Sequence, residues 1–411
     1  MKSEETDRTM PAIGEPRKAA LTFIFVTVAL DMLALGMIAP VLPRLITEFL
    51  GGREARSAEM YGLFATVWAA MQFLFSPVLG SLSDRFGRRT VILTSNIGMG
   101  LDYLVMAVAP SLAWLFAGRV ISGITAASIP TAMAYIADVT PPEKRSAGFG
   151  IISAAFGMGF VLGPAIGGLL GSVNPRLPFW VAGAFSLLNA LYGLLVLPES
   201  LPQEHRSSFS WKRANPVGSL TMLRSHRELL GLAVVLFLGY VAHQVLTSVW
   251  VLYADFRYRW SDRAVGLSLA AVGICSAVVG AILLKPTLKR MGERTAMLVG
   301  LTFGAIGFAL FGLAPTGVLF ASAIPVMSLW GLAGPTAQNS MTRRVGPAEQ
   351  GQLQGAINSL RGVAGLIGPG MFTYTLALGL SSHGWPGAPW FLAAGLLAAS
   401  LVVAVAVTGK D

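Results

Sequence analysis

The sequence predicts an all-α membrane protein whose twelve transmembrane helices form two pseudo-symmetric halves of six. Three observations support this prediction. Of the 411 residues, 54% are hydrophobic and only 12% are charged, which is far from the composition of a soluble domain. Apolar runs of about 20 residues, the length that spans a bilayer, recur along the whole chain. Glycines and prolines of the first half reappear 205 residues later in the second.

Each expected helix is an apolar run that ends at a short polar break. The expected spans of the first half are 19–43, 59–81, 90–109, 112–136, 147–172 and 178–197. Those of the second half are 229–253, 263–285, 294–313, 315–340, 351–378 and 388–408. The first run follows a polar tail of mixed charge without a small-residue cleavage site, so we expect it to remain in the protein as a helix.

The longest polar break divides the chain into its expected domains. It contains PESLPQEHRSSFSWKRANPVG, which has the composition of a solvated linker. The expected parts are a cytoplasmic N-terminal tail (1–18), a six-helix half (19–197), a cytoplasmic linker (198–228) and a second six-helix half (229–408).

The basic residues indicate how the chain is oriented. With a cytoplasmic N-terminus, 21 Lys and Arg lie on the cytoplasmic side and 7 on the opposite side. This bias follows the positive-inside rule, so the net charge of +10 reflects topology and gives no reason to expect nucleic acid. We expect an integral protein of a bacterial inner membrane with both termini in the cytoplasm.

Five anchors share the 205-residue offset of the two halves. They are Gly87 and Gly292, Pro130 and Pro335, Pro142 and Pro347, Gly150 and Gly355, and Gly163-Pro164 and Gly368-Pro369. Two halves in one orientation are typical of a transporter that rocks around a site at the membrane midplane. A duplication retained only for stability is the alternative.

The charged loop GSLSDRFGRRT, residues 80–90, separates the second and third runs. We expect Gly80 and Gly87 to make tight turns and Asp84 to cap a helix or accept from arginine. The gating set expected here is completed by Arg85, Arg88 and Arg89. In the second copy, Lys289 replaces Asp84 and Glu293 replaces Arg88. Topology does not require Asp84, so we expect a latch between conformations, with a plain topology anchor as the alternative.

The fifth run repeats glycine every four residues. Gly159, Gly163, Gly167 and Gly171 leave a smooth ridge for close packing, and Pro164 frees one backbone carbonyl. We expect Gly163 and Pro164 to form a hinge at the interface between the halves. Ordinary close packing explains the glycines alone equally well.

Four ionisable residues fall at membrane depth: Asp31, Asp102, Arg119 and Arg361. A charge at the bilayer centre costs about 3 kcal/mol, so each is a functional candidate. Burial and a neighbouring arginine act in opposite directions on an acid, which can poise it to exchange protons. We therefore expect Asp31, Asp102 and Arg119 to couple transport to protons. A permanent structural ion pair is the alternative.

Polar side chains follow helical spacing along three of the runs. The stripes are Trp68, Gln72 and Ser76; Tyr240, Gln244 and Thr247; and Gln354, Asn358 and Arg361. With Met71, His243 and Trp330 nearby, they predict a cavity that suits an amphipathic organic molecule. For any single member, an interhelical hydrogen bond is the alternative.

The sequence lacks the motifs that are typical of several other classes of protein. There is no Gly-Lys-Ser/Thr phosphate loop, no HExxH pair and no nucleophile-base constellation. The single cysteine, Cys275, excludes an intramolecular disulfide, and His243 has no second ligand at metal spacing. We expect neither an enzyme nor a bound cofactor or metal.

Several stretches carry a family resemblance that covers nearly the whole chain. GSLSDRFGRR and LFAGRVISG resemble signatures of the major facilitator superfamily. FGMGFVLGPAIGG resembles the helix 5 motif of its drug:proton antiporters. ALDMLALGMIAPVLPRL and SVWVLYADFRYRWS are similar to the tetracycline-resistance efflux branch.

The resemblance implies the major facilitator fold and the export of a small amphipathic, drug-like molecule in exchange for protons by alternating access. The implied partners are a small-molecule substrate, protons and the lipid bilayer, for a chain that acts as a monomer. Two alternatives stay open: a sugar or organic-acid symporter or uniporter, and a non-transporting receptor or scaffold.

The chain departs from that branch at three positions. The exporters typically carry an acid in helix 9 and a histidine in helix 8, where alignment puts Gly304 and Ser276. Arg361 adds a cation where they are typically uncharged. The departures put tetracycline itself in doubt and favour a substrate of anionic or polyhydroxy character.

Overall fold

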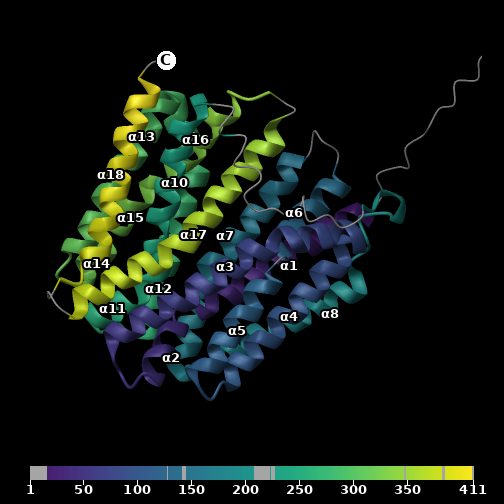
Figure 1. Cartoon of the computed structure of the whole chain (residues 1–411), viewed down its shortest axis with the longest axis horizontal. Helices are drawn as coiled ribbons and strands as arrows, with labels where there is room; N and C mark the ends of the chain where they lie inside the picture. The colour runs from purple at the N-terminus through teal and green to yellow at the C-terminus, as the bar shows by residue number, and fades with distance from the viewer. Residues whose placement is uncertain are drawn as a thin grey trace, which may run out of the picture.

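Helices alone build the part of the chain that the structure describes (Figure 1). The computed structural model describes residues 16–126, 128–140, 145–207, 223, 227–346, 349–381 and 385–409. Most of the expected N-terminal tail and linker, and the repeat anchors Pro142 and Pro347, lie outside these residues.

The first half runs from α1 to α8. Its helices are α1 (Pro16–Ile38), α2 (Leu42–Phe49), α3 (Glu54–Phe86), α4 (Arg88–Val108), α5 (Leu112–Thr125), α6 (Ser128–Val139), α7 (Arg145–Val173) and α8 (Leu177–Val196). A short 3-10 turn, η2 (Gln203–His205), follows.

The second half runs from α10 to α18. Its elements are α10 (Arg227–Ser248), α11 (Trp250–Tyr258), α12 (Asp262–Val278), the π-helical η4 (Val279–Leu283), α13 (Leu284–Leu313), α14 (Gly317–Ser322), α15 (Ile324–Ser328), the 3-10 turn η5 (Leu329–Leu332), α16 (Ala333–Thr342), α17 (Gln350–Ser381) and α18 (Ala388–Thr408).

Eleven helical stretches in the described residues are long and apolar enough to cross a membrane, against twelve expected. The difference lies in one stretch of 52 residues, Asp262–Leu313, which contains two of the expected helices. Gly292 breaks this stretch with φ 74° and ψ 169°. Gly87 has a similar conformation, φ 102° and ψ 153°, between α3 and α4. Only glycine adopts this conformation readily, so these two anchors of the repeat are structurally equivalent.

Gly80 does not make the turn that we expected. It lies inside α3, which continues to Phe86, five residues beyond the expected end of the second helix at 81. A polar turn extends this helix past the apolar run, and the helix ends at Gly87, which has a positive φ.

Both halves interrupt one helix at an equivalent place. The fourth span breaks at Ala126, between α5 and α6. The tenth span breaks into α14, α15, η5 and α16. Gly331, 205 residues after Ala126, lies in η5. Irregular backbone within a spanning segment is tolerated where it is buried in protein or lines a cavity, so we expect both breaks to face protein or a cavity and not lipid.

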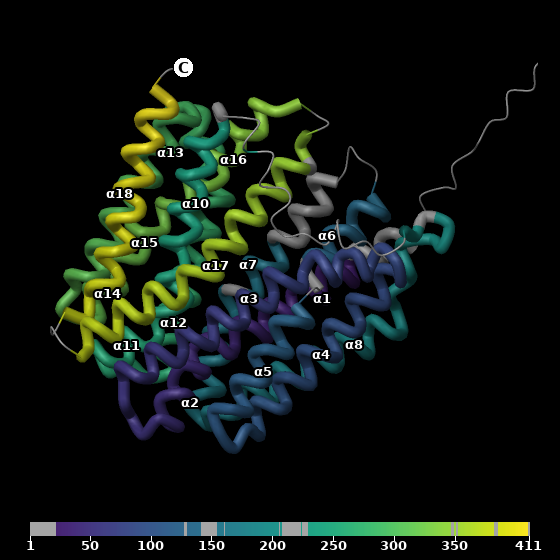
Figure 2. The backbone as a smooth tube through the Cα atoms, in the orientation of Figure 1, coloured from purple at the N-terminus to yellow at the C-terminus, as the bar shows by residue number. Residues whose placement is uncertain are grey.

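The halves meet mainly through two helix pairs, α3 with α17 and α7 with α12. Figures 1 and 2 show the two groups of helices converging near α2 and α11 and diverging toward the end that carries the C-terminus. The glycine ridge of α7 packs mainly on its own half: a Cβ at Gly163 would lie 2.7 Å from the Gly36 Cα of α1. The opposite face of α7 contacts the other half, since a Cβ at Gly168 would meet the backbone carbonyl of Asp262. The ridge therefore belongs only in part to the interface between the halves.

Candidate functional site

Ion pairs join the two halves at the end of the bundle that carries α2 and α11, here called the far end. Arg44 at the start of α2 pairs with Asp262 at 2.7 Å and with Asp255 at 3.2 Å, and it also donates to the carbonyl of Trp260. A second, more exposed pair joins Arg259 to Glu54 at 3.2 Å. We call the contacts of Arg44 with Asp255 and Asp262 the far-end clamp.

Sequence reasoning missed the far-end clamp. Arg44 and Asp255 lie in two of the stretches that carry the family resemblance, but 211 residues separate them in the chain. The hydroxyl of Tyr61 on α3 also donates to the carbonyl of Thr247 on α10 at 2.9 Å, so hydrogen bonds reinforce the same closure.

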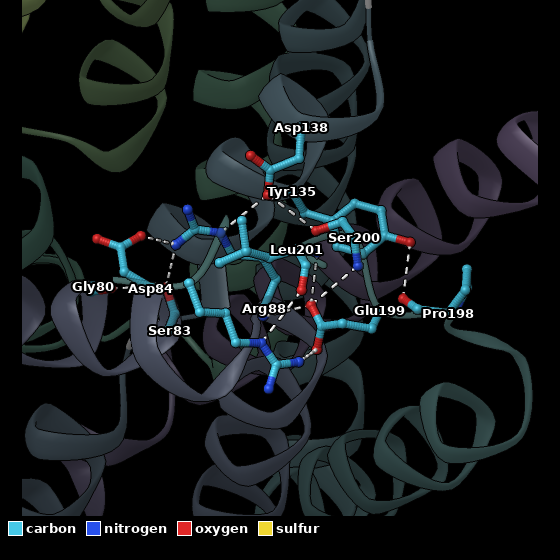
Figure 3. Close-up of polar contacts among 11 residues, drawn as sticks. Gly80, Ser83, Asp84, Arg88, Tyr135, Asp138, Pro198, Glu199, Ser200 and Leu201 are labelled. Atoms are coloured by element: carbon cyan, nitrogen blue, oxygen red, sulfur yellow. Dashed lines mark hydrogen bonds and ion pairs between the residues drawn. The ribbon is translucent and has the colours of Figure 1, made fainter. Parts of the chain in front are cut away.

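At the opposite end, here called the linker end, Arg88 organises the expected loop (Figure 3). Its guanidinium contacts Asp84 at 2.5 Å, Asp138 of α6 at 3.1 Å and the hydroxyl of Ser83 at 2.6 Å. Asp84 therefore pairs with arginine, one of the two roles expected for it. It does not cap α4.

The cap of α4 comes from a residue that sequence reasoning missed. A carboxylate oxygen of Glu199, just after α8, accepts from the backbone N–H of Arg88 at 2.8 Å and also from the N–H groups of Ser200 and Leu201 (Figure 3). The other basic residues of the loop lie outside this network: Arg89 donates to the carbonyl of Leu194 at 2.7 Å, and Arg85 is exposed over the Phe86 ring.

The equivalent loop of the second half holds the same pair with its charges exchanged. Glu293 contacts Arg343 at 3.1 Å and the amide of Asn339 at 2.7 Å. Glu293 and Arg343 lie 205 residues after Arg88 and Asp138. In the described residues, the ion pairs at the linker end each stay on one side of the bundle, so this end lacks a counterpart of the far-end clamp.

The three expected coupling residues lie buried together in the first half. Their side chains come from α1, α4 and α5, with 1% of Asp31, 2% of Asp102 and 6% of Arg119 exposed. All three are within electrostatic reach of Tyr103. The carboxylate of Asp31 accepts from the Asn189 amide at 3.4 Å.

Asp102 and Arg119 do not form the permanent ion pair that was the alternative. Arg119 lies over the Trp68 ring, 5.4 Å from its centroid, and both carboxylate oxygens of Asp102 lack a hydrogen-bond partner. Ser122 is the polar neighbour of Asp102, but its geometry falls outside that of a hydrogen bond. The Asp102 carboxylate instead lies against the backbone of Gly118, where a Cβ would approach it to 2.5 Å.

The expected polar surface of the second half also comes together. The Arg361 guanidinium lies 4.9 Å from the centroid of the Tyr240 ring, and the rings of His243 and Trp330 are 5.8 Å apart. His243 and Arg361 are exposed although both lie within spanning helices. Trp330 is supplied by η5, at the break in the tenth span.

Helices α3, α10 and α17 lie side by side at Gln244. A Cβ on Gly365 of α17 would touch both the Gln244 amide and Ala69, one turn from Met71 and Gln72. Gln354 accepts from Gln338 within its own half at 3.0 Å. Asn358 is exposed, and Met71 and Gln72 are half-buried.

The chain is similar to known transport and resistance proteins. The family model described as Major Facilitator Superfamily matches residues 24–369. The chain is 39% identical to the Tetracycline resistance protein, class C, of Escherichia coli, over 92% of this chain and 94% of that one. It is 36% identical to the class E protein of the same species, over 93% of each. Among solved structures, the human organic anion transporter MFSD10 (TETRAN) superposes with a TM-score of 0.70 at 24% identity, covering 95% of this chain and 100% of that one.

Proposed function

Because the chain belongs to the major facilitator superfamily, we propose that it exports a small amphipathic organic molecule in exchange for protons by alternating access. The family establishes an all-α integral membrane transporter, as predicted from the sequence, and not an enzyme. Relatives that are named as tetracycline resistance proteins support a drug-like cargo.

The main support for the proposal is that ionisable side chains within the spanning helices are buried in the first half and exposed in the second. Asp31 and Asp102 are buried in the first half, whereas His243 and Arg361, which lie in spanning helices of the second half, are exposed. Tyr240 is half-buried. A carboxyl group that gains and loses a proton as its access changes can drive the exchange of a cargo held next to it. Arg119 supplies a fixed positive charge within electrostatic reach of Asp102.

The ion pairs at the two ends supply the gates of this cycle. The far-end clamp holds the halves together in the present state, while the Arg88 network stays within the first half. In the alternate state the far-end clamp opens, and the loop of residues 80–90 latches the linker end. Bending of α7 at Gly163 and Pro164 would let its two faces follow α1 and α12 separately.

Transport in vesicles of opposite orientation tests this proposal. Inverted vesicles containing the protein should accumulate members of a drug panel, tetracycline included, when their lumen is acidified, and a protonophore should abolish the uptake. Vesicles without the protein are the control. Proton-independent flux, or no flux of any panel member, contradicts the proposal.

Arg361 also favours a second candidate, a symporter that takes up an organic acid. The cation is exposed at membrane depth, and Gly304 occupies the place of the acid that the tetracycline exporters carry. Right-side-out vesicles would then accumulate the acid with protons, and inverted vesicles would not. The direction of flux therefore separates the two functions.

A further inference from the structure

Arg361 is a cation at membrane depth without an acidic partner. It lies on α17, next to Gly362, whose Cα faces the Phe73 ring of α3. In the described part of the chain no carboxylate pairs with Arg361, and its guanidinium lies over the Tyr240 ring. Arg119 also stacks on an aromatic ring, but only 6% of it is exposed, whereas Arg361 is an exposed residue.

The acids of the second half are held at its ends. Asp255 and Asp262 belong to the far-end clamp, and Glu293 pairs with Arg343 at the linker end. No aspartate or glutamate occurs in the sequence of α17 or of the break that supplies Trp330. A cation within a spanning helix is rare and often marks a path for a substrate or ion, so this surface is suited to a negative charge that arrives from outside.

Aromatic groups surround this cation on one side. Tyr240 lies under the guanidinium, and His243 stacks at a tilt against Trp330, which Phe308 supports at 5.7 Å. Gly239 brings the α10 backbone close to Trp330, since a Cβ there would lie 3.6 Å from its ring. A planar guanidinium binds a planar oxyanion through two parallel hydrogen bonds, and flat rings pack on flat aromatic molecules.

We propose that Arg361 binds the carboxylate of an aromatic carboxylic acid whose ring system lies against Tyr240, His243 and Trp330. The inference rests on the proposed function, because it names the chemical class of the cargo. The break in the tenth span places Trp330 in the site, which is where a discontinuous helix is expected to contact a transported molecule.

Binding to the purified full-length protein in detergent tests the assignment directly. The probes are coumarin-3-carboxylic acid and its ethyl ester, which differ in charge and share the ring system. Calorimetry should show that the wild-type chain binds the acid at least roughly tenfold more tightly than the ester, the difference expected for one charge-assisted pair. Equal affinity, or no binding of the acid, overturns the proposal.

Variants assign this preference to the side chain. Arg361→Gln should abolish the difference between acid and ester, and Arg361→Lys should retain part of it. Arg290→Gln removes an exposed charge of α13 outside the site and should leave the preference intact. A preference for the acid that survives in Arg361→Gln contradicts the assignment.

A chemical rescue separates lost charge from lost folding. In a Cys275→Ser background, which removes the only native cysteine, Arg361→Cys should lose the preference for the acid. Treatment with aminoethyl methanethiosulfonate restores a cation at this position and should restore the preference, whereas the neutral methyl reagent should not. Equal results with both reagents contradict a role for charge.

The proposed function can fail independently of this inference. If the wild-type chain transports a neutral drug in exchange for protons but does not prefer the acid, only the assignment of Arg361 is wrong. If it binds the acid selectively but proton gradients drive no flux, export by proton exchange is wrong and the binding site remains.

Discussion

The two halves build the same loop with opposite charges. In the first half Arg88 pairs with Asp138, and in the second Glu293 pairs with Arg343, at equivalent positions after a glycine of positive φ. The pair persists although both of its members have changed, so the architecture needs an ion pair between these helices in either polarity. Asp84 and Glu199 add contacts to Arg88 that the second copy lacks, since Lys289 and Ala404 occupy their equivalent positions.

The halves differ equally at membrane depth. The first buries two acids and one arginine, whereas the second exposes a histidine and an arginine and has no acid there. A buried acid changes charge with the access of water, while an exposed arginine keeps its charge at every physiological pH. We therefore propose that the first half exchanges protons and that the second half binds the cargo.

The largest effect is expected from Asp102→Asn, which keeps the shape of the side chain and removes its ability to exchange a proton. Proton-driven transport in proteoliposomes should fall to the level of protein-free liposomes, while cargo binding in detergent persists. Asp31→Asn should lower transport less, because Asn189 already hydrogen-bonds Asp31. Glu48→Gln, which removes an exposed carboxylate of α2, is the control. Normal proton-driven transport by both aspartate variants would move coupling out of the first half.

A charge exchange tests the inverted pair. Arg88→Glu places a third carboxylate beside Asp84 and Asp138, so transport should fall severely. Adding Asp138→Arg recreates the polarity of the second half and should recover stability by about 1–3 kcal/mol in a double-mutant cycle. The measurement is thermal unfolding in detergent together with transport. A double variant that is no better than the single one would show that polarity, and not pairing, is required.

The sequence was sufficient for the features that depend on local pattern. The apolar runs and the 205-residue offset predicted the spanning helices and the equivalence of Gly87 and Gly292. Asp31, Asp102 and Arg119 are buried in the same half, and their role in proton coupling stays a prediction. Contacts that depend on how distant segments close could not be predicted. The cap that Glu199 gives to α4 joins residues 111 apart, and nothing in the local sequence points from one to the other.

The far-end clamp tests how the halves depend on each other, because the first half supplies its cation and the second its carboxylates. Arg44→Gln leaves Asp255 and Asp262 facing each other without a partner, so the closed far end should be weakened by about 1–3 kcal/mol. The distance between spin labels at Glu48→Cys and Arg257→Cys, both in the Cys275→Ser background, should be longer in Arg44→Gln than in the chain that keeps Arg44. Arg259→Gln is the matched control: its side chain is 74% exposed, and exposed pairs contribute about 1 kcal/mol or less. If Arg44→Gln and Arg259→Gln lengthened the distance between the labels equally, burial of the far-end clamp would not determine its contribution to closure.

The smallest effect concerns the acid that the second half lacks. Gly304→Asp restores the carboxylate typical of the resembled exporters, but a Cβ at Gly304 would lie 2.7 Å from Leu397 and 2.9 Å from Trp330. Overpacking should lower the stability by about 1–3 kcal/mol and displace Trp330 from the cargo surface. Thermal unfolding and binding of coumarin-3-carboxylic acid should therefore both weaken. Gly395→Ala, at a position of α18 with open space around it, should leave both unchanged. Gly304→Asp could instead fold normally and gain proton-driven tetracycline export. The second half would then also be able to exchange protons, and the residue at position 304 alone would account for the difference between the halves.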